Sequence, residues 1–275
     1  MPKFSVTPVD EVRLYRAPLA KVLMQVQYSR TPQLVTDSAE ALIANALGRY
    51  PVRRRQVTAA VPNVVIDGQQ MPLPGGFTPG VALSFSDPQS RWQVSVTETA
   101  VALETNEYST RDDFCGRAAE IFAAITSVAL PPVVDRVGIR YIDRLTGEAL
   151  AKVPTYIVPT LAALVGCVDS PLTLHHSITE SQIEISTEER ILVRSGLLPA
   201  GAAFDPAIPP VPTPSWLLDM DVFTTQAGFP FDPHELAGRL HRYAETAYSF
   251  FRFATTEEFQ EEHRGEPAPI TGQMP

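Results

Sequence analysis

Segment 133–145 limits the choice of fold more than any other stretch, because its side chains alternate in character. Val137, Ile139 and Tyr141 are apolar. The positions that alternate with them are mostly basic and include Arg136, Gly138, Arg140 and Arg144. A period of two predicts a β-strand with one dry face and one charged face. Such a strand needs neighbouring strands and a covering layer, which favours a sheet packed against helices.

Other segments with alternating or β-branched character predict the neighbouring strands. They are 22–28, 52–57, 81–85, 92–97, 101–104 and 216–223, together with a meander of three strands over 172–179, 182–187 and 190–197. The turn at 87–90 and the stretch 71–80, which is rich in proline and glycine, predict loops. Short connections of this kind favour antiparallel pairing.

Capping residues predict where the helices begin. The Thr-Asp-Ser segment at 36–38 precedes an apolar stripe over 39–47, and the Ser-Thr pair at 109–110 precedes another over 114–125. Asp232 begins the longest helix, with a proline directly after it, and the residues over 156–165 predict a further helix. We therefore expect an α+β fold, an antiparallel sheet in one or two lobes with helices packed on one face. The expected boundaries are 1–150 for an N-terminal lobe, 151–265 for a C-terminal lobe and 266–275 for a flexible tail.

Composition excludes some classes of function. The chain has 275 residues and a formal net charge of −9, so its surface repels phosphate backbones and nucleic acid is not an expected partner. No apolar run has the length of a membrane helix, and the N-terminus has no apolar core of a signal peptide. The two cysteines, Cys115 and Cys167, lack the spacing of a zinc site. A cytoplasmic protein with reduced thiols is the expectation.

Four segments carry a resemblance to a known family. They are 17–22, the Arg-Val-Gly-Ile-Arg-Tyr-Ile-Asp strand at 136–143, the Leu-Asp-Met-Asp strand at 218–221 and the helix at 240–250. In these segments the chain resembles a sporadically distributed bacterial family of proteins of about this length, which share an Arg-x-Gly-x-Arg-Tyr-x-Asn/Asp strand. The resemblance covers nearly the whole chain and implies a bacterial or phage origin. It implies no catalytic residue, and the chain departs from the family pattern at Lys21, where an acidic residue is usual.

The arginine row of segment 133–145 has two interpretations. Arg136, Arg140 and Arg144 would bind an anionic ligand bidentately if they faced a concave surface, with Asp219 and Asp221 nearby. Alternatively, they pair with carboxylates on neighbouring strands, such as Glu104, Asp219 and Asp221. Pairing is the favoured interpretation, and these six residues are the candidate binding residues.

The second basic cluster is the run from Arg53 to Arg55. On a strand, Arg53 and Arg55 share one face and Arg54 lies on the other, and charge that protects an edge strand explains the run without a ligand. The histidines have no chelating spacing, since His175 and His176 face opposite sides of a strand and His234 and His241 lie two helical turns apart. We found no nucleotide-binding, hydrolase or metalloprotease motif, so no catalytic residue, metal or cofactor is assigned.

These features predict a non-enzymatic interaction protein of a bacterial or phage module, of a defence or toxin–antitoxin kind. A sheet face or edge would bind a protein partner or a second copy of the chain. The alternative is a sensor or enzyme for a small anionic, nucleotide-like ligand, which would bind to the arginine row.

Overall fold

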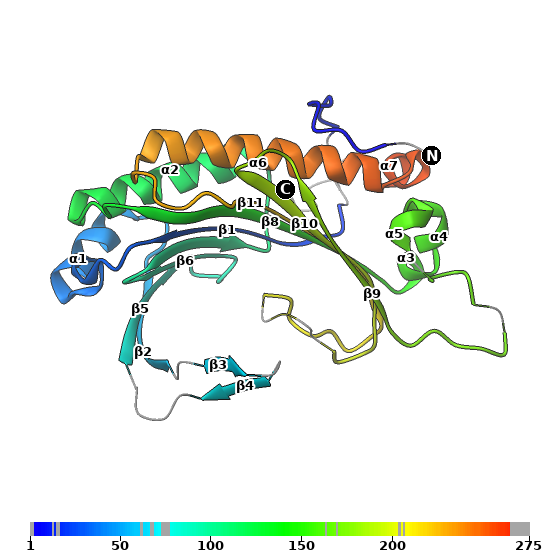
Figure 1. Ribbon diagram of the computed structural model, residues 1–275, viewed down its shortest axis with the longest axis horizontal. Helices are drawn as coiled ribbons and strands as arrows, with labels where there is room; N and C mark the ends of the chain where they lie inside the picture. The colour runs from blue at the N-terminus through cyan, green and yellow to red at the C-terminus, as the bar shows by residue number, and fades with distance from the viewer. Residues whose placement is uncertain are drawn as a thin grey trace, which may run out of the picture. The chain divides into compact units, whose positions relative to one another are not determined.

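The computed structural model describes residues 3–264, apart from residues 13, 15–16, 61–62, 67–68, 73–77, 163, 169, 203–204 and 206. The predicted flexible tail at 266–275 lies outside the described residues. The α+β class is confirmed, because a nine-stranded sheet carries helices on one side (Figure 1).

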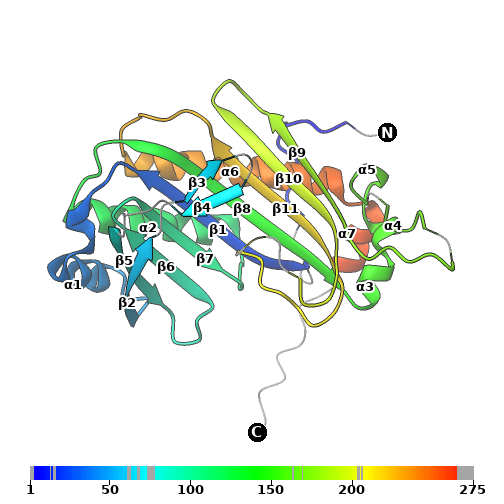
Figure 2. The same ribbon diagram turned by 60° about the horizontal axis from the view of Figure 1, so that its bottom comes forward.

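The order of the strands across the sheet is β2-β5-β6-β7-β1-β8-β11-β10-β9 (Figure 2). Their bounds are β1 Leu19–Tyr28, β2 Val52–Ala60, β5 Thr78–Ser86, β6 Trp92–Thr97, β7 Ala100–Thr105, β8 Val134–Thr146, β9 Ser177–Glu184, β10 Glu189–Leu198 and β11 Ser215–Thr224. A separate two-stranded sheet consists of β3 Asn63–Ile66 and β4 Gln69–Pro72. In the nine-stranded sheet, β2 and β9 are therefore the terminal strands.

The helical elements fill the connections between strands. They are the 3₁₀ helix η1 Pro32–Val35 and the α-helices α1 Asp37–Ala46, α2 Arg111–Val128, α3 Glu148–Ala151, α4 Val153–Tyr156, α5 Pro159–Ala162, α6 Pro233–Ala254 and α7 Glu257–His263. The predicted caps are confirmed: the hydroxyls of Thr36 and Thr110 accept hydrogen bonds from Ala39 N and Asp113 N, and the Asp232 carboxylate accepts from the first turn of α6.

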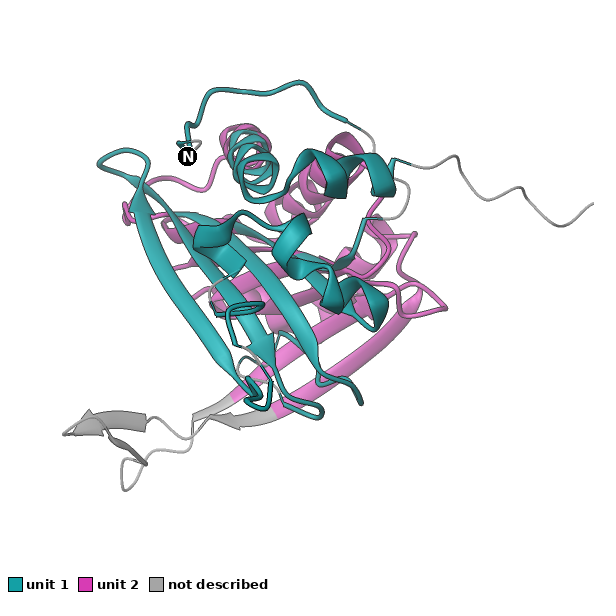
Figure 3. Ribbon diagram, turned by 90° about the vertical axis from the view of Figure 1, so that its right-hand side faces the viewer, with its two compact units in different colours: residues 1–22, 139–223, 242–275 teal, residues 23–138, 224–241 magenta. Residues whose placement is uncertain are grey.

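The chain forms two compact units, each assembled from separate segments (Figure 3). Unit 1 comprises Met1–Val22, Ile139–Phe223 and Arg242–Pro275, and unit 2 comprises Leu23–Gly138 and Thr224–His241. β1 and β8 each contribute residues to both units. The units therefore group the residues differently from the expected lobes 1–150 and 151–265.

The core of unit 2 follows the predicted alternation. Trp92, Val94 and Val96 of β6 are buried, and the intervening residues are partly exposed. The predicted apolar stripe of α2 is buried throughout, and its Phe114 ring lies 6.0 Å from the Trp92 ring. Burial of this stripe removes several large apolar side chains from water, and each contributes about 1.5–3 kcal/mol of transfer free energy.

In unit 1, the terminal strand β9 approaches its neighbour β10 closely at one glycine. Gly196 lies opposite Ile178, and its φ of +151° is unusual for an L side chain. A Cβ atom placed on Gly196 would lie 1.8 Å from the carbonyl oxygen of Ser177. This position therefore requires glycine, as expected where another backbone passes so near.

Several local predictions were wrong. In place of the single helix expected over 156–165, α4 ends at Tyr156 and the short helix α5 begins at Pro159, because Pro159 has no N–H group to continue helical hydrogen bonding. The meander has two strands in this region, since the polar residues Glu180 and Ser181 continue β9 and pair with Arg194 and Val193. The expected loop at 71–80 contains the end of β4 and the start of β5, and residues 73–77 lie outside the described residues.

Candidate functional site

Arg140 of β8 forms a bidentate ion pair with Asp219 of β11 in unit 1. Its Nε and Nη2 atoms donate to Asp219 Oδ1 and Oδ2, each at 2.7 Å. Nη2 also donates to Asp205 Oδ2 at 2.9 Å. The Asp219 side chain is 1% exposed and the Arg140 side chain 11% exposed, so this is a buried pair. Arg140 therefore has the ion-pair partner that the favoured interpretation of the arginine row expects.

Arg194 of β10 extends this pair into a cluster of five charged residues. Its Nη1 atom lies 3.5 Å from Asp219 Oδ2 and 3.7 Å from Asp205 Oδ2, while its Nε donates to Glu180 Oε2 at 2.7 Å. Glu180 lies directly opposite Arg194 in the pairing of β9 with β10. The cluster thus holds three carboxylates and two guanidinium groups. It has no surplus of positive charge that would attract an anion.

The ion pairs also keep Arg140 and Asp205 charged. Burial acts to lower the pKa of Arg140, but the hydrogen bond and charge of Asp219 prevail and raise it. Burial acts to raise the pKa of Asp205, yet the hydrogen bond from Arg140 brings it below its usual value. A guanidinium and carboxylates that stabilise one another in this way serve poorly as proton donors or acceptors near neutral pH.

The connection between β10 and β11 is attached to the sheet by the same arginine row. Arg140 binds Asp205 in this connection, and Arg144 Nη1 donates to the carbonyl oxygen of Pro209 at 2.8 Å. Asp205 Oδ1 in turn accepts from Ala207 N at 2.8 Å, which closes a local turn. Two members of the row therefore fix a segment of the chain itself.

The other predicted binding residues lie on β7, β8 and β11. Asp221 of β11 is partly exposed and has an interaction partner. Arg136 and Glu104 belong to unit 2, and each also has an interaction of its own. Of the six predicted residues, the structure brings together Arg140 and Asp219.

The second basic cluster, from Arg53 to Arg55 on β2, has a different environment. All three side chains are exposed, as are Gln56 and Val57 beyond them. Arg55 pairs with Asp37 Oδ1 at 3.0 Å and with Glu40 Oε2 at 2.9 Å. The part of the chain that the structure describes offers no ion-pair partner to Arg53 or Arg54. Two guanidinium groups thus remain open to solvent on a terminal strand.

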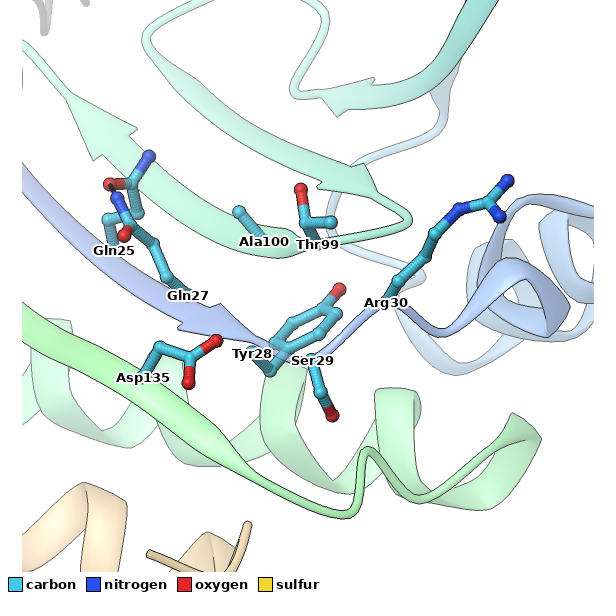
Figure 4. Close-up of a pocket in the computed structure, with 8 residues that line it drawn as sticks. All are labelled: Gln25, Gln27, Tyr28, Ser29, Arg30, Thr99, Ala100 and Asp135. Carbon is cyan, nitrogen blue, oxygen red and sulfur yellow. Dashed lines mark hydrogen bonds between the residues drawn. The ribbon is translucent and has the colours of Figure 1, made fainter. Parts of the chain in front are cut away.

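A shallow hollow of about 450 Å³ lies in unit 2, beside the end of β1 (Figure 4). The Gln25 and Gln27 side chains that line it are hydrogen bonded to each other, and Arg30 at its rim pairs with Glu98 at 2.6 Å. Asp135 is the one carboxylate among its lining residues. The hollow can accept a polar group, but its lining offers no nucleophile with a neighbouring base.

Metal sites and membrane-spanning helices are the remaining classes of feature. No group of three or more histidine, cysteine or acidic residues in the described part of the chain is arranged to hold a metal ion. Among its helices, none is both long and apolar enough to cross a bilayer.

Sequence reasoning missed three members of the charged cluster: Glu180, Arg194 and Asp205. Glu180 and Arg194 would have been found from the correct register of β9 and β10, because opposite charges at paired positions form cross-strand pairs. Asp205 lies in an irregular connection, where no periodic signal marks its partner.

Comparison of the chain with protein-family models, with curated proteins and with solved structures gives no match. The resemblance to the bacterial family with the Arg-x-Gly-x-Arg-Tyr strand stays a prediction.

Proposed function

We propose that this protein is a non-enzymatic binding protein that holds a polypeptide partner at a free edge of its sheet. The observation that carries the proposal is the environment of β2. Among the described residues this terminal strand pairs in its sheet with β5 alone, and its side chains from Arg53 to Val57 are exposed. Its outer edge presents unpaired backbone N–H and C=O groups, which an extended peptide can satisfy by adding as a further strand.

The ion pairs of the arginine row support this proposal over the anion-binding alternative. A nucleotide-like ligand would have to displace Asp219 and Asp205 from Arg140. Displacement would leave the buried Asp219 carboxylate without its bidentate partner, which costs several kcal/mol. The placement of the protein in a bacterial or phage defence or toxin–antitoxin module rests on the family resemblance.

Native mass spectrometry of the protein purified from its own host tests the proposal. We expect a polypeptide bound in simple stoichiometry. A bound small anion, lost in a folded Arg140→Ala variant, would overturn the proposal in favour of the ligand sensor.

Proline substitution then locates the edge. In an antiparallel pair, adjacent residues alternately direct their N–H groups inward and outward. Of Arg53→Pro and Arg54→Pro, one therefore breaks the ladder with β5 and lowers the melting temperature, whereas the other removes only an outward donor. We expect the variant that keeps its melting temperature to lose the bound polypeptide. Full retention of the polypeptide by that variant would exclude β2 as the edge.

A further inference from the structure

The charge on the β2 edge distinguishes between classes of polypeptide partner. Arg55 is neutralised within unit 2 by Asp37 and Glu40, and its Nη2 also donates to the carbonyl oxygen of Val35 at 2.8 Å. Arg53 and Arg54, next to it on the strand, are exposed, and the described residues offer them no such neighbours. A chain with a formal net charge of −9 thus presents two unneutralised guanidinium groups on a strand with a free edge.

The register of β2 places these two groups on opposite faces of the sheet. Arg53 lies opposite Phe85 of β5, and Arg54 lies opposite Ser84. A strand added to the outer edge of β2 would direct its own side chains alternately to the same two faces. Carboxylates at adjacent positions of that strand would therefore meet one guanidinium on each face, in the arrangement of cross-strand ion pairs. On the face of Arg53, Val57 is 70% exposed and offers an apolar contact.

We propose that the partner is an acidic, extended segment of another protein, which adds to β2 as a strand and pairs its carboxylates with Arg53 and Arg54. This inference rests on the proposed function and names the partner class for that edge. Arginine suits the role because its planar guanidinium binds a carboxylate with two parallel hydrogen bonds.

Two other occupants fit the edge less well. A second copy of the chain, paired antiparallel through β2 around its arginine run, would place like charges opposite one another, which is destabilising. A long nucleic acid would meet the acidic surface of the whole chain, and its phosphates cannot complete a β-ladder. A short acidic strand, in contrast, forms backbone hydrogen bonds with β2, and its few negative charges are repelled less by the acidic surface than those of a long nucleic acid.

Fluorescence anisotropy with defined probes tests the inference on the full chain. The probes are short labelled peptides in which pairs of valines alternate with pairs of glutamates, of glutamines or of lysines, so that each pair places one side chain on each face of the strand, and a single-stranded DNA. The test variant is Arg53→Glu/Arg54→Glu. The matched control is Arg49→Glu/Arg190→Glu, which makes the same change in net charge at two exposed arginines outside β2.

We expect the glutamate peptide to bind most tightly. The Arg53→Glu/Arg54→Glu variant should weaken that binding by about tenfold or more, because two ion pairs become two repulsions. The control variant should change it by less than about threefold, through long-range charge alone.

The outcomes separate the two proposals. Tighter binding of the glutamine or lysine peptide, or equal losses in the test and control variants, would overturn the acidic partner and leave strand addition standing. Preference for DNA over every peptide would overturn the acidic partner as well. If none of the peptides binds, the proposed function itself fails.

Discussion

The two arginine clusters of this protein differ in almost every physical respect. In the row on β8, Arg140 is buried, bound to two carboxylates and attached to a connecting segment of its own chain. In the run on β2, Arg53 and Arg54 are exposed and have no ion-pair partner within the described part of the chain. The comparison shows that the number of guanidinium groups in a motif does not by itself predict whether the motif binds an anionic ligand or partner. What matters is how much of their charge the fold has already neutralised.

The largest expected difference between the two clusters is in how much each one contributes to the free energy of unfolding. Arg140→Ala leaves the Asp219 carboxylate buried without its bidentate partner, so we expect the free energy of unfolding to fall by about 3–5 kcal/mol. Urea denaturation measures this loss. The double variant Arg140→Met/Asp219→Leu should recover much of it, since apolar residues can replace a buried pair. An unchanged unfolding midpoint for Arg140→Ala would mean that the row is free to bind a ligand.

The next effect concerns Asp143, a carboxyl on the same strand as the row. Burial raises the pKa of Asp143 to about 7. The folded state then holds a proton that the unfolded state releases near its ordinary pKa, so stability falls as the pH rises between these two values. From about pH 5 to about pH 8 this group alone should reduce the free energy of unfolding by about 2–3 kcal/mol.

Asp143→Asn removes this titration. We expect the variant to show a flatter stability curve than the parent chain over that range, measured by denaturation at a series of pH values. Identical pH dependence in the two proteins would show that Asp143 is ionised in the folded state.

A smaller effect distinguishes the two terminal strands. Gly196→Ala introduces a Cβ atom against the Ser177 carbonyl oxygen, so the β9 edge should separate from β10 at a cost of about 1–3 kcal/mol. Gly201→Ala is the matched control: Gly201 also has a positive φ, of +74°, but no atom lies within 4 Å of its added Cβ. Thermal unfolding should show the greater loss for Gly196→Ala, and equal losses would remove the close approach as the cause.

The smallest effect is expected at the β2 run. Arg53→Glu/Arg54→Glu should change the free energy of unfolding by less than about 0.5 kcal/mol, as is usual for exposed residues without specific partners. A loss of more than about 2 kcal/mol would show that these side chains stabilise the fold and would end the contrast between the clusters.

Periodicity and capping predicted most of the fold from the sequence. The alternation of β6 and the apolar stripe of α2 both depend on a single buried face, which is the strongest local signal a chain carries. The short helices α3 to α5 and the continuous β9 escaped prediction. In the first case prolines divide an apolar stretch, and in the second pairing with β10 overrides the polar character of the residues.

The charged cluster was predictable in part. An ion pair between Arg140 and Asp219 follows from two strands with complementary charges, although their adjacency does not. Asp205 could not have been assigned, because the path of the connection from β10 to β11 depends on contacts between residues far apart in the sequence. The terminal place of β2 agrees with the edge strand that the charged run at 53–55 predicted, and it accounts for the exposure of Arg53 and Arg54.

Hydrogen exchange of the protein with and without the peptide that alternates pairs of valines with pairs of glutamates tests the central claim most directly. A free edge strand has outward amides that exchange rapidly, and an added strand protects them. The account predicts that the peptide slows exchange in β2, over residues 52–57, and leaves the terminal strand β9 unchanged. Protection of the segments around Arg140 and Asp219, with β2 unaffected, would contradict it.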